Sequence, residues 1–211
     1  MVKNTIFSYY EKIGDEVRCI DEEIPFEIPD TWEWIRLKNC CKKEIRRGKS
    51  PKYIYQSQTL VFAQKCNTKH NGIDIGLAQY LDESTLSKYP TDEYMQDGDI
   101  VINSTGTGTL GRVGFYRATD YHENLLIVPD SHVTTIRAFD NMSKFYLFVF
   151  MKANQGELEK RGEGSTNQKE LKPVTLKEML VPIPSAREQE HIASAIQKAF
   201  SIISIVEKSL S

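Results

Sequence analysis

Residues 97–112 read Asp97-Gly-Asp-Ile-Val-Ile-Asn-Ser-Thr-Gly-Thr-Gly-Thr-Leu-Gly-Arg112. The Asp-Gly pair predicts a turn, and the apolar run after it predicts a buried strand over residues 99–103. The glycines that follow spell G-x-G-x-x-G, which binds a dinucleotide only when a helix begins directly after the last glycine. Residues 112–117 are instead β-formers without a helical period. The pattern therefore predicts a glycine turn at a hairpin tip, with its threonines and Arg112 placed to approach a phosphate backbone or a DNA groove.

Further elements are predicted on both sides of this hairpin. Alternation of apolar and polar residues indicates strands, and helical spacing behind a capping residue indicates helices. The polar residues 1–23 are expected to form a lead-in, and the glycine-rich residues 157–172 a loop. These patterns predict an α+β fold, a mixed and strand-rich domain with short helices over residues 1–182. The other expected elements are strands over 32–37, 59–66 and 132–139, a short helix over 81–89 opened by Asp82, and a helix over 143–154 capped by Ser143.

The end of the chain predicts a long helix over residues 185–211. Ser185-Ala-Arg-Glu188 has the form of a capping box, in which the Ser185 hydroxyl accepts from the amide three residues on and the Glu188 side chain bonds back. Apolar residues then recur at alternating spacings of four and three, the a/d seam of a coiled coil. Such a helix either folds onto its own domain or pairs with another long helix, and its length favours pairing. The seam residues are Ile192, Ile196, Ala199, Ile203, Val206 and Leu210.

The net charge of −2 over 211 residues hides two opposite blocks. Residues 11–33 carry nine acidic against two basic side chains, and residues 36–52 carry eight basic against one acidic. The basic block would either neutralise DNA phosphates or form an ordinary solvated face. The apolar fraction of 40% is typical of a globular protein, and the length allows a sizeable core in one domain.

The cysteines and the apolar runs indicate the compartment. The first residues lack the apolar core of a leader peptide, and the longest apolar run, near residues 145–151, is too short to span a bilayer. We therefore expect a cytoplasmic protein with reduced thiols. Cys66 and His70 have the spacing of half a zinc site, but no second pair completes it. A disulfide framework is not expected in a chain of this length from its four cysteines, Cys19, Cys40, Cys41 and Cys66.

Two further stretches favour opposite functions. Asp130 with Glu170 and Lys172 fits the loose pattern of metal-dependent nucleases, in which two carboxylates hold Mg²⁺ and a lysine assists. Residues 164–169 read Gly-Ser-Thr-Asn-Gln-Lys. The amides of Asn and Gln carry the paired donor and acceptor that read adenine in the major groove. The same stretch also fits an ordinary surface loop.

Five more stretches complete an ordered series with residues 97–112 and 164–169. They are Ile24-Pro-Phe-Glu-Ile-Pro-Asp-Thr-Trp-Glu-Trp34, Arg47-Gly-Lys-Ser-Pro51, Val61-Phe-Ala-Gln-Lys-Cys-Asn67, Asp130-Ser-His-Val133 and Val181-Pro-Ile-Pro-Ser-Ala-Arg-Glu-Gln-Glu190. Together the series resembles the DNA specificity (S) subunit of type I restriction-modification systems, over about residues 20–205.

The resemblance implies a non-catalytic chain that binds double-stranded DNA sequence-specifically. It would read one half of a bipartite target and position adenine methyltransferase (M) and restriction (R) subunits. Those partners would use SAM, ATP and Mg²⁺, while this chain would bind no cofactor and no metal, and no membrane. One recognition domain over 1–182 and one spacer helix over 185–211 are half the usual content. This implies a homodimer, or pairing with a second specificity chain, through the helix.

The resemblance and the chemistry of the loops together name the residues expected to face DNA, while Gly48 and the turn glycines are expected to maintain loop geometry. Two rival functions stay open, a metal-dependent DNA endonuclease and a protein-interaction module that acts through its C-terminal helix. The residues expected to face DNA are Arg46, Arg47, Lys49, Lys52, Lys65, Asn67, Thr107, Arg112, Ser165, Asn167, Gln168 and Lys169.

Overall fold

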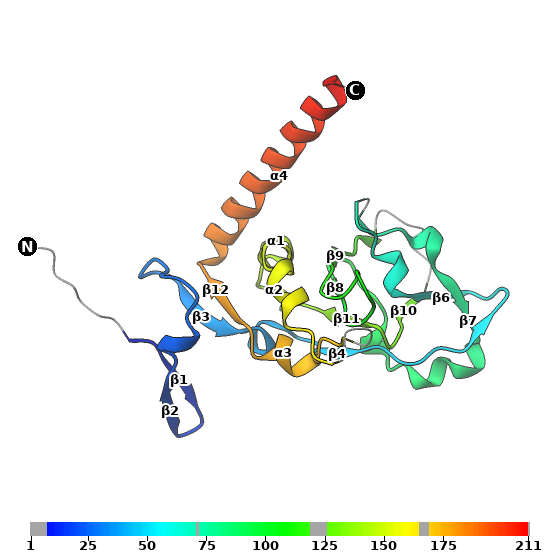
Figure 1. Cartoon of the computed structure of the whole chain (residues 1–211), viewed down its shortest axis with the longest axis horizontal. Helices are drawn as coiled ribbons and strands as arrows, with labels where there is room; N and C mark the ends of the chain where they lie inside the picture. Colours follow the sequence, from blue (N-terminus) through cyan, green and yellow to red (C-terminus); the bar gives the residue numbers. More distant parts are fainter. Residues whose placement is uncertain (1–7, 71, 119–125, 165–168, 211) are drawn as a thin grey trace, which may run out of the picture.

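The computed structural model describes residues 8–70, 72–118, 126–164 and 169–210. It is a mixed α+β structure, as predicted, in which a strand-rich body carries short helices and one long helix, α4, extends from it (Figure 1). Two four-stranded sheets form the body, with strand orders β10-β6-β7-β5 and β4-β11-β8-β9. Two two-stranded ribbons, β1-β2 and β12-β3, lie on the side of the body from which α4 emerges (Figure 1).

The strands, α-helices and 3₁₀ turns of the described residues have the following bounds. The strands are β1 (Tyr10–Ile13), β2 (Glu16–Cys19), β3 (Glu33–Arg36), β4 (Arg46–Arg47), β5 (Tyr53–Ile54), β6 (Thr59–Phe62), β7 (Gln79–Leu81), β8 (Ile100–Asn103), β9 (Val113–Phe115), β10 (Leu126–Pro129), β11 (Val133–Ile136) and β12 (Leu180–Ile183). The α-helices are α1 (Lys144–Ala153), α2 (Gln155–Lys160), α3 (Pro173–Lys177) and α4 (Ala186–Leu210). The 3₁₀ turns are Asp21–Glu23, Leu37–Cys40, Gln64–Cys66, Ile75–Leu77, Glu83–Lys88 and Thr91–Glu93.

Strand β8 accounts for the apolar run that predicted a buried strand over residues 99–103. Successive side chains of a strand point to opposite faces. Ile100 and Ile102 enter the core formed with α1 and β12, whereas Val101 enters a second core formed with β6 and β10. The strand is therefore buried on both faces, which requires an uninterrupted apolar sequence.

Several predicted helix boundaries are confirmed by their caps. The Ser143 Oγ accepts from the Tyr146 amide at 3.4 Å and opens α1. The Ser185 Oγ accepts from the Glu188 amide at 3.3 Å and opens α4. The Glu188 carboxylate differs from the capping-box prediction, because its Oε2 accepts from the Trp32 indole at 3.1 Å and links α4 to the segment before β3.

Other boundaries correct the sequence analysis. The strand predicted over 59–66 ends at Phe62, because the 3₁₀ turn Gln64–Cys66 follows it. The helix predicted behind Asp82 is a 3₁₀ helix, although Asp82 caps it as expected. The loop predicted over 157–172 is wrong at its start, since α2 continues to Lys160 and buries Leu158.

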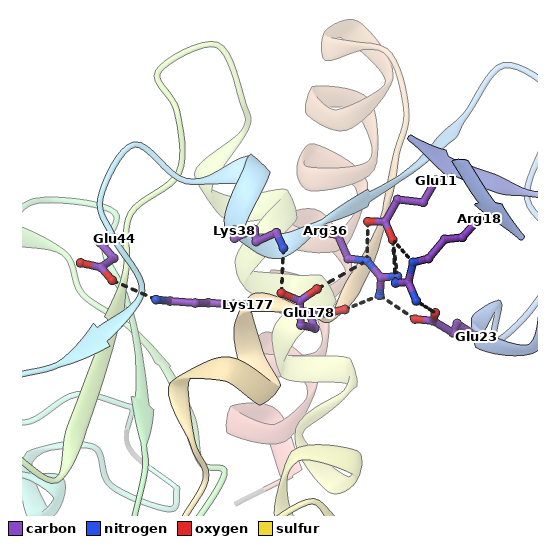
Figure 2. Close-up of polar contacts among 8 residues, drawn as sticks. All are labelled: Glu11, Arg18, Glu23, Arg36, Lys38, Glu44, Lys177 and Glu178. Atoms are coloured by element: carbon purple, nitrogen blue, oxygen red, sulfur yellow. Dashed lines mark hydrogen bonds and ion pairs between the residues drawn. The ribbon is translucent and has the colours of Figure 1, made fainter. Parts of the chain in front are cut away.

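The prediction of a polar lead-in over residues 1–23 is also corrected, because the described part of this segment contains the β1–β2 hairpin and a 3₁₀ turn. Arg36 holds this segment against the body, and its side chain is only 4% exposed. Its Nε and Nη2 donate to the Glu11 carboxylate at 2.8 and 2.9 Å, and its Nη1 donates to the Glu178 carbonyl at 2.7 Å. Glu23 adds an ion pair at 2.8 Å (Figure 2).

The two charged blocks of the sequence therefore neutralise each other in part. Glu11 also accepts from Arg18 of its own hairpin at 2.7 Å. Around the same junction, Lys38 pairs with Glu178 at 2.7 Å and Lys177 with Glu44 at 2.9 Å (Figure 2). These contacts tie the hairpin, β3 and the segment before β12 into one unit.

Gly48 shows why the basic segment needs a glycine. Its amide donates to the Val133 carbonyl at 3.0 Å, and the chain there passes directly over the backbone of Pro129 and Asp130. A Cβ at position 48 would lie 2.0 Å from the Pro129 carbonyl oxygen. The expectation that Gly48 maintains loop geometry is confirmed.

We predict that Gly48→Ala lowers the free energy of unfolding by about 3 kcal/mol or more, because neither backbone can move away without breaking sheet hydrogen bonds. Gly156→Ala is the matched control, since a Cβ there meets nothing within 4 Å and the residue lies in α2. It should raise stability by about 0.5 kcal/mol. Urea denaturation of both variants measures the difference, and equal effects would contradict the close approach at Gly48.

A second prediction concerns pH. The hydrogen bond from Arg36 is the main cause that lowers the pKa of Glu11 from 4.5 to about 2. A depressed folded-state pKa stabilises the protein above the unfolded value, and this stabilisation is lost as the pH falls from about 4.5 toward about 2. Glu11→Gln should therefore reduce the free energy of unfolding by about 2 kcal/mol at neutral pH and by less below pH 4.5.

Urea denaturation across this pH range measures the effect of Glu11→Gln. Glu16→Gln, at an exposed position of the same hairpin, is the matched control and should change stability by less than about 0.5 kcal/mol. If the loss of unfolding free energy caused by Glu11→Gln does not become smaller at acid pH, the ion pair between Glu11 and Arg36 is not the source of that loss.

Candidate nucleic-acid interface

The predicted glycine turn lies between β8 and β9 at the tip of a hairpin. The Gly111 amide donates to the Asn103 carbonyl at 2.8 Å, and the Asn103 amide donates to the Arg112 carbonyl at 3.0 Å, which closes the hairpin. Gly106, Gly108 and Gly111 have φ values of 99°, 73° and 76°, in the left-handed region that favours glycine. The sequence prediction of a turn instead of a nucleotide site is confirmed, since a strand and no helix follows the last glycine.

Two side chains hold this turn from inside the fold. Asn67 is buried, and its Nδ2 donates to the Asn103 Oδ1 at 3.2 Å and to the Arg112 carbonyl at 2.9 Å. The Arg112 guanidinium donates to the carbonyls of Asn67 and Gly108 at 2.8 and 3.0 Å. This corrects the expectation that Asn67 faces DNA, because its amide is already engaged in the interior. Arg112 lies at the surface of the turn but also fixes its shape.

Stretches far apart in the sequence meet at the same turn. The Ser104 amide donates to the His132 carbonyl at 2.8 Å, and the Leu171 amide donates to the Ser104 carbonyl at 2.8 Å. The Thr105 Oγ1 lies 2.7 Å from the His132 Nδ1. Arg47 forms an ion pair with Glu170, which also bridges to the backbone of Thr105. Four of the stretches quoted above, around residues 47, 104, 131 and 170, therefore converge in space.

A shallow hollow of about 260 Å³ opens at this convergence, lined by Gly106, Thr107, Gly108, Leu110, Glu159 and Lys169. Gln64 of the 3₁₀ turn Gln64–Cys66 lies next to Gly106, where a Cβ would meet its side chain, and Lys65 is the exposed residue that follows it. We call this region the turn surface and define it by Lys65, Thr105, Thr107, Arg112, His132 and Lys169. The sequence predicted that Thr105 approaches a phosphate backbone or a groove, and the resemblance included the stretch around His132, but the contact between the two side chains was not predicted.

The expected DNA-facing cations differ in their partners. Arg46 pairs with Asp92 at 3.1 Å and with the buried Glu93 at 2.8 Å. Lys49 lies 3.7 Å from Glu93. Lys52 pairs with Asp82 at 2.7 Å, and Arg47 pairs with Glu170. In contrast, Lys65 and Lys169 form no ion pair within the part of the chain that the structure describes. Cations already paired must exchange partners to bind phosphate, so of the described cations expected to face DNA, those of the turn surface are the ones without a competing carboxylate partner.

Ser165, Asn167 and Gln168 lie outside the described residues, so their expected contacts with DNA stay sequence predictions. Lys169, which follows them, is exposed at the hollow.

The three residues of the nuclease alternative have other roles. Asp130 is buried, its Oδ1 accepts from the His132 amide at 2.8 Å, and burial raises its pKa. Glu170 pairs with Arg47, and Lys172 pairs with Glu163 at 2.6 Å. Among the described residues no group of three His, Cys, Asp or Glu side chains could hold a metal ion. Nothing in this arrangement supports the endonuclease alternative.

All four cysteines are free thiols, as the composition predicted. Burial raises the pKa of Cys40 and of Cys41 to about 12, so neither is a ready nucleophile at neutral pH.

Helix α4 packs on its own domain through its first turns alone. Its first turns pack on the body, where Gln189 accepts from the Ser143 amide at 3.0 Å and Ala193 is buried. Beyond Ile196 the helix leaves the body (Figure 1), and large apolar side chains become exposed, Phe200 by 62% and Leu210 by 83%. Of the helices in the described ranges, none is both long and apolar enough to cross a lipid bilayer.

Comparisons with known proteins agree on one family. Residues 29–211 match the model of the type I restriction modification DNA specificity domain. The type I restriction enzyme MjaVIII specificity subunit of Methanocaldococcus jannaschii is 26% identical over 189 residues, which are 86% of this chain and 42% of the relative. The chain thus spans less than half the length of this relative.

Solved structures share the fold. The HsdS subunit from Thermoanaerobacter tengcongensis has a TM-score of 0.64 at 18% identity, over 89% of this chain and 42% of that chain. A chain from a study of complex assembly and conformational transition of the type I R-M system has a TM-score of 0.67 at 18% identity, over 88% and 42%. Because the family model covers most of the sequence and the fold agrees, the chain belongs to the type I restriction-modification DNA specificity domain family.

Proposed function

We propose that this chain reads a DNA sequence as one half of the bipartite target of a type I restriction-modification system. The observation that carries the proposal is the convergence of distant stretches on the turn surface, where Lys65 and Lys169 form no ion pair among the described residues. Fixed loops with available cations and hydroxyls suit DNA, because phosphate contacts set the register and side chains at the groove read the bases.

In this proposal the side chains have distinct tasks. Lys65 and Lys169 contact phosphates, and Thr107 approaches the groove from the turn that Arg112 and Asn67 hold rigid. Asn167 and Gln168 would supply the amides that read adenine, as the sequence predicts. A rigid scaffold below the contacts raises the affinity for DNA. A loop that becomes ordered only on binding loses conformational entropy, and this loss weakens the binding.

The partners follow from the same proposal. Residues 1–182 form the recognition domain and residues 185–211 the pairing helix, through which a second specificity chain would add the other half of the target. The exposed apolar residues of α4 beyond Ile196 support this, because two such stripes in isologous contact would remove both from water. Adenine methyltransferase and restriction subunits would then carry out the chemistry with SAM, ATP and Mg²⁺, while this chain, acting in the cytoplasm, binds DNA without catalysing a reaction.

The interaction-module alternative rests on the same exposed stripe of α4. It differs in one respect, since it predicts no affinity for DNA even in the presence of the methyltransferase subunit.

Salt dependence tests the assignment of phosphate contacts. Each lost phosphate contact makes the slope of log K against log salt shallower by about 0.9 on duplex DNA. Lys65→Ala and Lys169→Ala should each show this change, measured by fluorescence anisotropy with a labelled 30-base-pair duplex between about 50 and 200 mM salt. Lys42→Ala is the matched control from the basic block, because Asp140 already neutralises that lysine. Its slope should equal that of the wild type.

Two results would contradict this assignment. A wild-type slope near zero would show that binding involves no phosphate contacts, at Lys65 and Lys169 or elsewhere. A larger change in slope for Lys42→Ala than for Lys169→Ala would locate the phosphate contacts on the 36–52 block.

A further inference from the structure

The connection from β5 to β6, residues 55–58, carries the most exposed of the large apolar side chains in the described ranges. Tyr55 is 94% exposed at a bend of the chain, and Gln56 beside it is also exposed. Among the described residues neither side chain has a hydrogen bond, an ion pair or a ring contact. Ile54 and Tyr80, directly opposite each other in the β5–β7 ladder, are exposed as well. These exposed side chains form an apolar patch at and beside the edge strand β5.

The backbone below Tyr55 is held firmly on both sides. On one side the Asp82 amide donates to the Lys52 carbonyl at 2.8 Å. On the other side the Gln58 amide and the Thr59 hydroxyl both donate to the Glu83 Oε1 at 3.1 Å. The loop is therefore fixed in position while its two outermost side chains are unengaged, which is the arrangement of a pre-organised contact element.

A short extended segment connects this loop to the turn surface. Lys49 pairs with the backbone of Asp130, and Asp130 accepts from the His132 amide at 2.8 Å. The six residue steps from Lys49 to Tyr55 span at most about 20 Å when extended. This length corresponds to about six base pairs of duplex DNA at roughly 3.4 Å each. The loop and the turn surface therefore lie within the length of one short duplex.

We propose that Tyr55 and Gln56 form a second DNA-reading element of this chain. In this inference, which rests on the proposed function, the Gln56 amide bonds to a base edge in the major groove and the Tyr55 ring packs against a thymine methyl group beside it. A glutamine amide matches the adjacent acceptor and donor of adenine, and the thymine methyl group is the apolar surface that the major groove offers to a side chain. The polar sequence Gln56-Ser-Gln58 beside the ring suits a hydrated groove better than the dry centre of a protein interface.

The experiment selects bound duplexes from a pool with a randomised segment, using the full chain together with its methyltransferase subunit. Tyr55→Ala should weaken binding of the sequence that the wild type selects by roughly tenfold, because an apolar contact is lost. Gln56→Ala should keep the selected sequence except at one base pair, where the preference is lost. Tyr10→Ala is the matched control, since Tyr10 is 65% exposed on β1 at the opposite end of the molecule (Figure 1). It should bind as the wild type does.

The outcomes separate this inference from the proposed function. If the wild type selects a sequence and both loop variants bind it within about twofold, the loop does not read DNA, although the proposed function stands. If Tyr55→Ala instead loses the methyltransferase subunit, the patch is a protein contact and the inference fails. If the wild type selects no sequence, the proposed function and the inference fail together. Thermal unfolding of each variant should match the wild type, because the substituted side chains are exposed.

Discussion

The buried guanidinium of Arg36 joins the parts of this molecule that must keep a fixed relation. It bonds to Glu11 of the hairpin and to the carbonyl of Glu178 just before β12, and it lies at the end of β3 (Figure 2). Strand β12 pairs with β3 and leads directly into α4. The direction in which α4 leaves the body therefore depends on this cation and its carboxylates, together with the contacts of Glu188, Gln189 and Ala193 in the first turns of the helix. In the proposed function that direction sets the distance between two recognition domains, so rigidity here is needed for a target with a fixed spacer.

A second constraint is close packing of backbone below the proposed DNA contacts. Gly48 passes over the carbonyl of Pro129. The Asn67 side-chain amide donates to the Asn103 Oδ1 and to the Arg112 carbonyl, and the Asn103 amide donates to the Gln64 carbonyl. Many of the residues that carry the family resemblance are of this kind, because they hold loops in place. The side chains left over at the surface, such as Lys169 and Tyr55, are those available to meet a ligand. The scaffold and the proposed contacts are thus made by different residues, since Lys169 belongs to one of the quoted stretches and Tyr55 lies between two of them.

Sequence reasoning found the elements whose signals are local. The apolar run of β8, the glycines of the turn, and the caps of α1 and α4 all act within a few residues of their own position. It could not find interactions between distant residues. The basic block suggested a DNA-binding face, but the acids that neutralise Arg36 and Arg47 lie 25 and 123 residues away in the sequence. The hairpin at residues 10–19 was missed for the same reason. Its polar sequence resembles a lead-in, and Arg36, which binds its Glu11, lies 25 residues away in the sequence. Helix α2 was missed because it buries one apolar side chain, Leu158, and has no apolar period.

Methylation mapping at base resolution tests the central claim, that this chain reads one half of a bipartite DNA target and pairs through α4. The chain would be co-expressed with its methyltransferase subunit in a host without adenine methylation. Two identical chains paired through α4 predict a split, palindromic motif with methylated adenine in each half. An asymmetric split motif would contradict pairing between identical chains and reveal a second reader. Absence of methylation, with the methyltransferase active beside another specificity chain, would contradict the account as a whole.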